Sequence, residues 1–304
     1  MPSLQRRTAM QNKGEAIARV RWDRRRFLLA GAATLGAASI AGCANHARDS
    51  SPVLSEDLAF AFDPAGNRYE MDFLDDEVRR VDAHGAVVWR QGSASNPDLF
   101  NYPTSMAVDD DGTVFVADRG NGEIERLDGS GTPRQTFGGQ ELTGADDLAL
   151  ESTQHQLYVS DHVEHHVRVY STQGASLRTI GDFGLDGAGL NGPRGVAISP
   201  ARELHVVDSG NGRVQVFTLD GSYRRSYGDV GGDDVALLAP RDIVFDGGGR
   251  ALVSDPPRQR LARYEAGGAF IEFVHLEDHA GRTGVPLYLA VAPDGRLYAT
   301  VAFV

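Results

Sequence analysis

The sequence predicts an all-β fold, a six-bladed β-propeller over residues 58–304 with a short last blade. Three observations support this prediction. The 304 residues include 36 Gly and 13 Pro, which favours many turns and short strands over long helices. A short apolar segment that closes on Asp recurs about every 46 residues. Each copy is flanked by further short strands, and such units bury their apolar faces only by stacking on one another.

The recurring segment is clearest in four central copies, at residues 114–118, 157–161, 204–208 and 251–255. Weaker copies at 68–72 and 297–301 bring the number to six. The closing positions of successive copies lie 43 to 47 residues apart, which is the length of one propeller blade.

Four short strands are predicted for each unit. An apolar first strand, as at 105–108, is followed by a turn and by the recurring second strand. The third strand alternates apolar and polar residues, as at 214–217, so one of its faces is expected to be buried. A Gly turn then leads to the fourth strand. The sixth unit has room for two strands, at 287–292 and 297–302, and its blade is therefore short.

Two of the units closely resemble the NHL repeat. The resemblance rests on Val-Val-Asp-Ser-Gly-Asn-Gly-Arg-Val-Gln-Val-Phe at 206–217 and on Val-Ala-Asp-Arg-Gly-Asn-Gly at 116–122. Pro-Arg-Gly-Val-Ala-Ile at 193–198 is similar to the opening of that repeat. The resemblance is strong in the second and fourth units and weak at both ends. It implies a propeller whose last blade is often completed by N-terminal strands, and residues 44–57 can supply one strand at most.

Residues 1–42 are predicted to be an export signal. Basic residues precede an apolar run from Phe27 to Ile40, which is too short to span a bilayer comfortably. Arg24 and Arg25, followed by Arg-Phe-Leu, resemble the twin-arginine consensus. Ile-Ala-Gly-Cys at 40–43 resembles a lipobox, which implies that Cys43 is lipidated and becomes the N-terminus. The alternatives are a signal cut near Ala41, a retained anchor, or export by the general secretory route.

We therefore expect an exported, membrane-anchored lipoprotein on the periplasmic or cell-surface side, held to the membrane through the lipid on Cys43. Residues 43–57 are polar and small, and they are predicted to form a tether before the propeller.

The charge of the remaining chain excludes one class of partner. Residues 43–304 contain 22 Arg, no Lys and 40 acidic residues, a formal charge of −18. Nonspecific binding to nucleic acid needs cations that displace phosphate counterions, so we expect no nucleic-acid partner. A single Cys also excludes a disulfide framework and a Cys-rich zinc site.

One face of the predicted propeller is the expected ligand face. The turns between second and third strands emerge there, together with the connections between blades. The recurring Asp residues reach this face at positions 72, 118, 161, 208 and 255. The same residue in five blades indicates a structural role, in which Asp accepts backbone N–H groups or pairs with the Arg of a neighbouring blade. A cation site normally needs unlike residues.

Two arginines are the predicted ligand-binding residues. Arg194 and Arg241 each follow Pro at the opening of the inner strand of adjacent blades. Both side chains can therefore reach the channel mouth and face a carboxylate or phosphate. The competing interpretation is that both arginines form salt bridges between blades.

A divalent metal ion is the possible cofactor, although the sequence requires none. Asp161, His162 and His165 lie in one turn and are the weaker candidates for ligands. The alternative is a solvated polar turn.

These observations predict a binding module that holds a protein or small-molecule ligand on the expected ligand face. The sequence identifies no catalytic residues, which remain unknown. The alternative function is that of a metal-dependent lyase or lactonase-like hydrolase with its site at the channel mouth.

Overall fold

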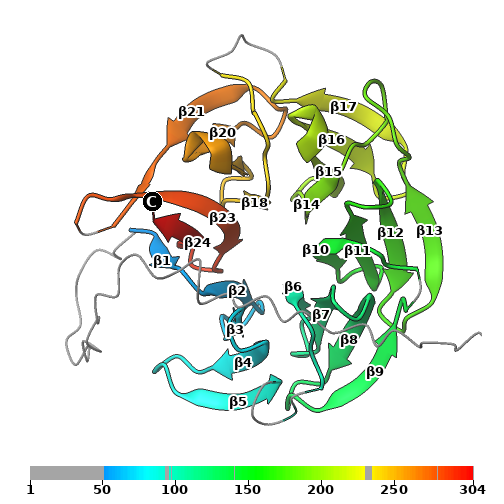
Figure 1. Ribbon diagram of the computed structural model, residues 1–304, viewed down its shortest axis with the longest axis vertical. Coiled ribbons are helices and arrows are strands. Elements are labelled where there is room, and N and C mark those ends of the chain that lie inside the picture. Colours follow the sequence, from blue (N-terminus) through cyan, green and yellow to red (C-terminus); the bar gives the residue numbers. More distant parts are fainter. Residues whose placement is uncertain are drawn as a thin grey trace, which may run out of the picture. The chain divides into compact units, whose positions relative to one another are not determined.

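The computed structural model describes residues 51–92, 96, 98–139, 141–229, 235–278 and 280–303. Within these residues the strands form six four-stranded sheets, which lie as blades around a central axis (Figure 1). The prediction of an all-β, six-bladed propeller is confirmed. The described part contains two short 3-10 turns, η2 (Ser209–Asn211) and η3 (Pro256–Arg258), and no helix there is long and apolar enough to cross a membrane.

Blades 1 to 5 are antiparallel meanders of consecutive strands, with the first strand innermost. Blade 1 contains β2 (Leu58–Phe62), β3 (Arg68–Asp72), β4 (Glu77–Val81) and β5 (Val87–Gly92). Blade 2 contains β6 (Pro103–Val108), β7 (Val114–Asp118), β8 (Glu123–Leu127) and β9 (Pro133–Phe137). Blade 3 contains β10 (Ala145–Glu151), β11 (Gln156–Asp161), β12 (His166–Ser171) and β13 (Ser176–Ile180). Blade 4 contains β14 (Pro193–Ile198), β15 (Glu203–Asp208), β16 (Arg213–Thr218) and β17 (Tyr223–Tyr227). Blade 5 contains β18 (Ile243–Phe245), β19 (Ala251–Asp255), β20 (Arg260–Tyr264) and β21 (Phe270–Val274).

Blade 6 joins the beginning and the end of the described chain. It contains β22 (Leu276–Glu277), β23 (Thr283–Val291), β24 (Leu297–Phe303) and β1 (Val53–Ser55), in the order β1-β24-β23-β22. The strand β1 lies beside β24 and runs parallel to it (Figure 1). Residues 43–57 were expected to be a tether that could supply one strand at most. Three of them, Val53–Ser55, form that strand. The last blade thus has four strands like the others, two more than the sequence led us to expect from its own unit, but the two added strands, β1 and β22, are only three and two residues long.

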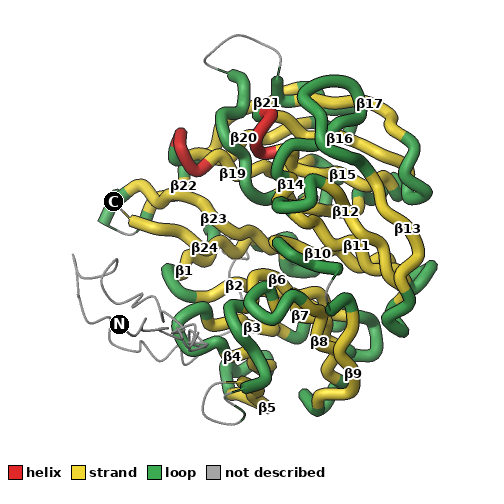
Figure 2. The backbone as a smooth tube through the Cα atoms, turned by 45° about the vertical axis from the view of Figure 1, so that its right-hand side comes forward, coloured by secondary structure: helices red, strands yellow, loops and turns green. Residues whose placement is uncertain are grey.

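The core lies between neighbouring blades. The second strand is buried along its whole length in blade 2, and its residue Phe115 packs in one cluster with Leu157 and Val159 of blade 3. The outermost strands are largely exposed, as in β13. Figure 2 shows the yellow strands of successive blades following one another around the ring. Each blade therefore covers the apolar face of the next, which is why the apolar strands recur at blade length.

The two ends of the ring differ. The turn at Gly120 donates to the carbonyl of Asn101 (2.7 Å), and the turn at Gly210 donates to that of Asn191 (2.8 Å). Turns between second and third strands thus pack against the connections between blades at one end, which we call the mouth face. The other end, the tight-turn face, carries the short turns that follow the first and third strands.

Candidate functional site

The recurring Asp residues fix the segments that enter the blades at the mouth face. Asp208 is fully buried, and its carboxylate accepts hydrogen bonds from the backbone N–H of Asn191 (2.6 Å) and from Asn211 Nδ2 (2.8 Å). Arg213 Nε also lies 2.9 Å from it. The backbone donor belongs to the connection that enters blade 4, and the arginine belongs to blade 4 itself rather than to a neighbouring blade. This Asp fastens a blade to its own entry segment.

Asp118 occupies the same position in blade 2. It is fully buried and accepts hydrogen bonds from the backbone of Asn101 (3.0 Å) and from Asn121 Nδ2 (2.8 Å). Burial raises the pKa of Asp118 to about 7, and these hydrogen bonds oppose the shift only in part. The carboxyl group is used by the fold.

A charged cluster lies at the centre of the mouth face. Asp146, at the start of β10, is buried with 3% of its surface exposed, and Arg194 Nη1 lies 2.9 Å from its Oδ2. Arg119 Nη1 lies 3.2 Å from its Oδ1. His162 Nδ1 lies 3.4 Å from Oδ2. We call these four side chains the Asp146 cluster. Three successive blades, 2 to 4, contribute to it.

The hydrogen bonds of His162 indicate which ring nitrogen carries the proton. Nδ1 lies 2.8 Å from the carbonyl oxygen of Gly144, and Nε2 lies 3.1 Å from Arg119 Nη2. A carbonyl only accepts and a guanidinium only donates, so the arrangement fits a neutral ring protonated at Nδ1. His162 thus connects Arg119 to the carboxylate of Asp146.

Arg241 approaches the same opening from blade 5. Its Nη2 donates a hydrogen bond to the hydroxyl of Tyr288 in blade 6, and its guanidinium carbon lies 4.6 Å from the centre of that ring. Burial lowers the pKa of Arg241, but Tyr288 and the carboxylates of Asp146 and Asp242 outweigh burial and raise it. The guanidinium therefore remains charged.

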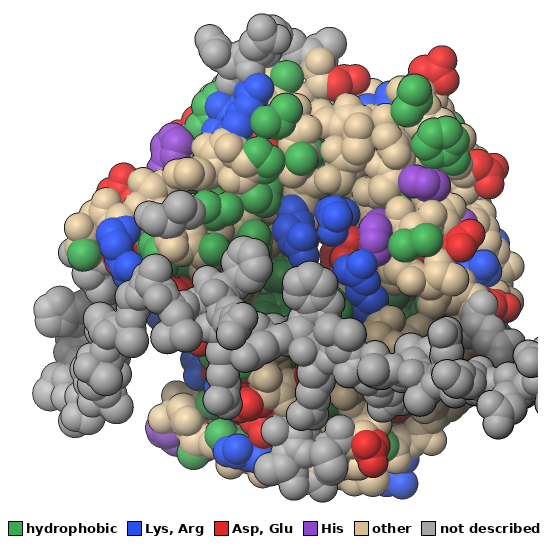
Figure 3. Space-filling model, viewed as in Figure 1, with side chains coloured by type: hydrophobic (Ala, Val, Ile, Leu, Met, Phe, Trp, Pro, Cys, Tyr) green, Lys and Arg blue, Asp and Glu red, His purple; other side chains and the backbone are tan. Residues whose placement is uncertain are grey.

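The structure brings the two predicted ligand-binding arginines together. Arg194 and Arg241 line one narrow passage with Asp146, Asp242 and Tyr288. Figure 3 shows basic, acidic and His side chains gathered around the hollow at the centre of the ring. Arg194 forms a salt bridge to Asp146 in the preceding blade, as in the competing interpretation of salt bridges between blades. In the part of the chain that is described, Arg241 bonds to a phenol instead.

The three candidate metal ligands have separate partners. The carboxylate of Asp161 accepts the backbone N–H of Thr143 (2.8 Å), and His165 Nδ1 accepts that of Gly192 (2.9 Å). His162 belongs to the Asp146 cluster. Among the described residues, no three His, Cys, Asp or Glu side chains are grouped as metal ligands would be.

The export residues lie elsewhere. Cys43, Arg24 and Arg25 fall outside the described residues.

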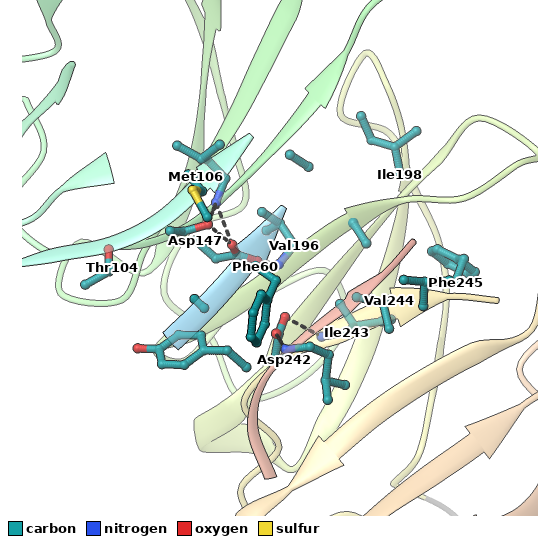
Figure 4. A pocket seen from close by; sticks show the side chains of 18 residues that line it. Phe60, Thr104, Met106, Asp147, Val196, Ile198, Asp242, Ile243, Val244 and Phe245 are labelled. Atoms are coloured by element: carbon teal, nitrogen blue, oxygen red, sulfur yellow. Dashed lines mark hydrogen bonds between the residues drawn. The ribbon is translucent and has the colours of Figure 1, made fainter. Parts of the chain in front are cut away.

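Beneath the mouth lies a cavity of about 340 Å³, lined by all six inner strands. Most of the residues that line it are apolar, and the carboxyl groups of Asp147 and Asp242 stand out among side chains such as Val196 and Val244 (Figure 4). Asp147 accepts the N–H of Val196 (2.8 Å), and Asp242 accepts that of Leu289 (2.6 Å). Each carboxylate thus binds the backbone of the next blade.

Burial makes both carboxyl groups easier to protonate. It raises the pKa of Asp147 to about 6 and that of Asp242 well above its usual range; the charge of Asp146 adds to the shift of Asp147, and the charge of Asp147 adds to that of Asp242. The channel therefore carries less negative charge at Asp147 and Asp242 as the pH falls towards 6.

Asp146, Arg119 and Tyr288 were not predicted from the sequence. A signal was present for one of them. Asp146 directly follows the residue paired with Asp161, just as Arg194 follows the residue paired with Asp208. Comparing the openings of the inner strands would therefore have placed Asp146 beside Arg194. Arg119 and Tyr288 have no such counterpart in the sequence pattern.

Comparison with known proteins supports the repeat. The NHL repeat model matches residues 100–127 and 190–217, which contain the first three strands of blades 2 and 4. These are the two units in which the resemblance was strongest, and that prediction is confirmed. No curated protein matches the sequence.

Several solved propellers have a similar fold. A catalytically inactive virginiamycin B lyase from Staphylococcus aureus with quinupristin is 12% identical, with a TM-score of 0.60 over 78% of this chain and 74% of that one. A chain of a nidogen/laminin complex is 19% identical, with a TM-score of 0.60 over 80% and 82%. A streptogramin B lyase is 11% identical, with a TM-score of 0.59 over 81% and 91%. At these identities the likeness concerns the fold. The chain is thus a six-bladed β-propeller that carries NHL repeats in its second and fourth blades.

Proposed function

We propose that this protein is an exported, lipid-anchored propeller that binds an anionic ligand at the mouth of its central channel. One observation carries the proposal. Arg119 and Arg194 both bind the carboxylate of Asp146, and Arg241 lines the same passage as Arg194. The mouth therefore gathers three guanidinium groups on a propeller whose formal charge is strongly negative.

The geometry favours a carboxylate or a phosphate. Guanidinium groups present several N–H donors in a plane, which suits the paired oxygens of these anions. Arg194 and Arg241 are about one-third exposed or less, and each contact to a charged oxygen contributes roughly 1.5–3 kcal/mol. Arg194 holds Asp146 at the same time, so Arg241 is the arginine with more bonding capacity left for a ligand.

Motifs in the sequence support the location. The Arg pair at 24–25 precedes an apolar run, and the lipobox-like segment 40–43 ends in Cys43. An exported lipoprotein would meet its ligand outside the cytoplasm.

The test is ligand-induced thermal stabilisation with inorganic phosphate and citrate, measured against chloride at equal ionic strength. A ligand that binds the folded protein raises its melting temperature. We expect a shift for the wild type, a smaller one for Arg241→Ala, and none for Arg194→Ala combined with Arg241→Ala. Each variant is compared with its own unliganded state, because loss of Arg194 also removes a partner of Asp146.

Arg224→Ala is the matched control, since Arg224 is exposed on the outer strand β17. It should respond like the wild type. Equal shifts in the wild type and the double variant, or no shift with either anion, would contradict the proposed site.

A lyase or hydrolase is the second candidate. It is favoured by His162, a titratable side chain hydrogen-bonded at the mouth where a ligand would be held, and by the propeller lyases of similar fold. Metal analysis of the dialysed protein separates the two functions. Zinc or calcium retained in stoichiometric amount would support the metal-dependent enzyme, and a folded, metal-free protein would count against it.

A further inference from the structure

Three large apolar side chains are exposed on the mouth face beside blades 3 and 4. Val163, Phe183 and Leu185 have 49%, 63% and 67% of their surface exposed. Val163 lies in the turn after β11, and the other two lie in the connection from β13 to β14. We call these residues the apolar ledge. Single exposed apolar side chains are common, but a group of them on a ligand face marks an interaction surface.

The connection that carries Phe183 and Leu185 is fixed by its own hydrogen bonds. Gly184 N–H donates to the carbonyl of Leu190 (3.0 Å), whose own N–H donates to Asp182 (2.8 Å). Asn211 Nδ2 donates to the carbonyl of Gly184 (2.9 Å). Leu190 is fully buried in the core. The loop therefore directs one apolar side chain inwards and presents two others to solvent in a defined position.

The ledge is continuous with the Asp146 cluster. His162 belongs to that cluster and directly precedes Val163. In the same turn, the ring of His165 lies 4.9 Å from that of Phe183, and its Nδ1 accepts the N–H of Gly192. Figure 3 shows hydrophobic and His side chains next to one another to the right of the central hollow. A ligand held by the arginines can therefore extend onto the ledge.

The charges around the ledge restrict the kind of partner. Asp182 and Asp186 are exposed and flank Phe183 and Leu185. An anionic bilayer would place phosphates against these carboxylates as well as against the arginines, which is unfavourable. A suitable partner instead concentrates its negative charge at the arginines and places uncharged groups on the ledge.

The extent of the surface indicates a polypeptide. Arg119 belongs to blade 2, the ledge lies between blades 3 and 4, and Arg241 opens blade 5. A small anion contacts one part of this surface, whereas several consecutive residues of a peptide can cover it. We propose that the mouth face binds a peptide segment in which an acidic residue, held by Arg194 and Arg241, is followed by apolar side chains that pack on the ledge. This inference rests on the proposed function, because the acidic residue occupies the proposed anion site.

The test begins with random octapeptides displayed on phage and selected on the purified protein. The strongest sequences are synthesised with fluorescein, and their binding is measured by fluorescence anisotropy. We expect Asp or Glu within about three residues of an aromatic or aliphatic residue. Phe183→Ser with Leu185→Ser should weaken binding at least tenfold, and Arg241→Ala should do the same, because anchor residues dominate such interfaces. Changing the acidic residue of the peptide to Asn should abolish the effect of Arg241→Ala.

The matched control is Leu177→Ser with Tyr223→Ser, which removes two exposed apolar side chains from the outer strands β13 and β17. These variants should bind within twofold of the wild type. The altered apolar residues are exposed and Arg241 is half-buried, so the melting temperature and far-ultraviolet circular dichroism of each variant serve as the folding check.

The outcomes separate the inference from the proposed function. Loss of affinity in Arg241→Ala but not in the ledge variant would overturn the ledge and leave the anion site standing. Loss of affinity in the ledge variant but not in Arg241→Ala would mean that the arginine does not hold the peptide. That result would overturn both the anion site and its combination with the ledge. Failure to select any acidic–apolar sequence would overturn the peptide. Sedimentation of the protein with phosphatidylglycerol vesicles, dependent on Phe183 and Leu185, would replace the peptide with a membrane surface.

Discussion

Replacing Asp208 with Asn should strongly destabilise the protein. The Asp208 carboxylate is fully buried and accepts four donors: the backbone N–H of Asn191, Asn211 Nδ2, Arg213 Nε and Gln215 Nε2 (3.1 Å). Asn has one acceptor oxygen and would turn an NH₂ group towards the remaining donors. It would also leave the guanidinium of Arg213, 9% exposed, without its counter-charge. Removing one partner of a buried ion pair costs about 3–5 kcal/mol.

The matched control is Asp72→Asn. Asp72 is the recurring Asp of blade 1, but its carboxylate accepts the backbone N–H groups of Leu74 (3.0 Å) and Asp75 (3.2 Å) in an exposed turn. We expect a loss below about 1 kcal/mol there. Urea unfolding followed by circular dichroism measures both variants, and the melting temperature of Asp208→Asn should fall by roughly 6–20 °C, at about 2–4 °C per kcal/mol for a domain of this size.

Two results would refute the structural interpretation of the Asp residues. One is an equal effect of the two substitutions. The other is a wild type that loses stability on addition of a chelator while Asp208→Asn does not, because that pattern would indicate a bound cation.

Three further predictions concern Asp118, the strand β1 and the export segment. Because burial raises the pKa of Asp118 to about 7, its contribution to stability is present at low pH and is lost as the pH rises from about 4 to about 7. The free-energy cost of Asp118→Asn should therefore shrink by about 1 kcal/mol or more over that range in urea melts, and a constant cost would contradict the assignment. Deleting Val53–Ser55 should lower the melting temperature by about 4–8 °C, since β24 loses its parallel partner; an unchanged value would mean that β1 adds nothing to blade 6. Cys43→Ser should release the protein from carbonate-washed membranes, and Arg24→Lys with Arg25→Lys should block its export. Unchanged membrane retention would argue against the lipid, and normal export of the double variant would indicate the general secretory route.

The blades could be predicted because the same packing requirement acts on each of them and leaves a repeated pattern in the sequence. Each second strand must be apolar to lie between two neighbouring blades, and this requirement repeats at blade length. The strand β1 was harder to find. Val53–Ser55 is three residues long and follows a polar segment, and a parallel pairing with β24 leaves no periodic pattern in so short a strand.

The candidate site was predicted in part. Arg194 and Arg241 stood out because each follows Pro at the opening of an inner strand. Their partners did not, because each pairing crosses a blade boundary: Asp146 precedes Arg194 by one blade, and Tyr288 follows Arg241 by one blade. Asp146 and Asp147 were not singled out in the sequence, and only the closed ring brings both carboxylates to the channel.

The direction of β1 determines which end of the propeller is attached to whatever precedes it. Val53 lies opposite Tyr298, at the beginning of β24 and next to the turn in which Gly295 donates to Ala292. The chain therefore enters the propeller at the tight-turn face, at the opposite end of blade 6 from Tyr288 and the arginines. Nine residues separate Cys43 from Val53, so the two residues lie at most about 35 Å apart. A lipid on Cys43 would therefore hold the tight-turn face close to the membrane through a short linker. The mouth face would then be the untethered end, open to a partner arriving from the surrounding space.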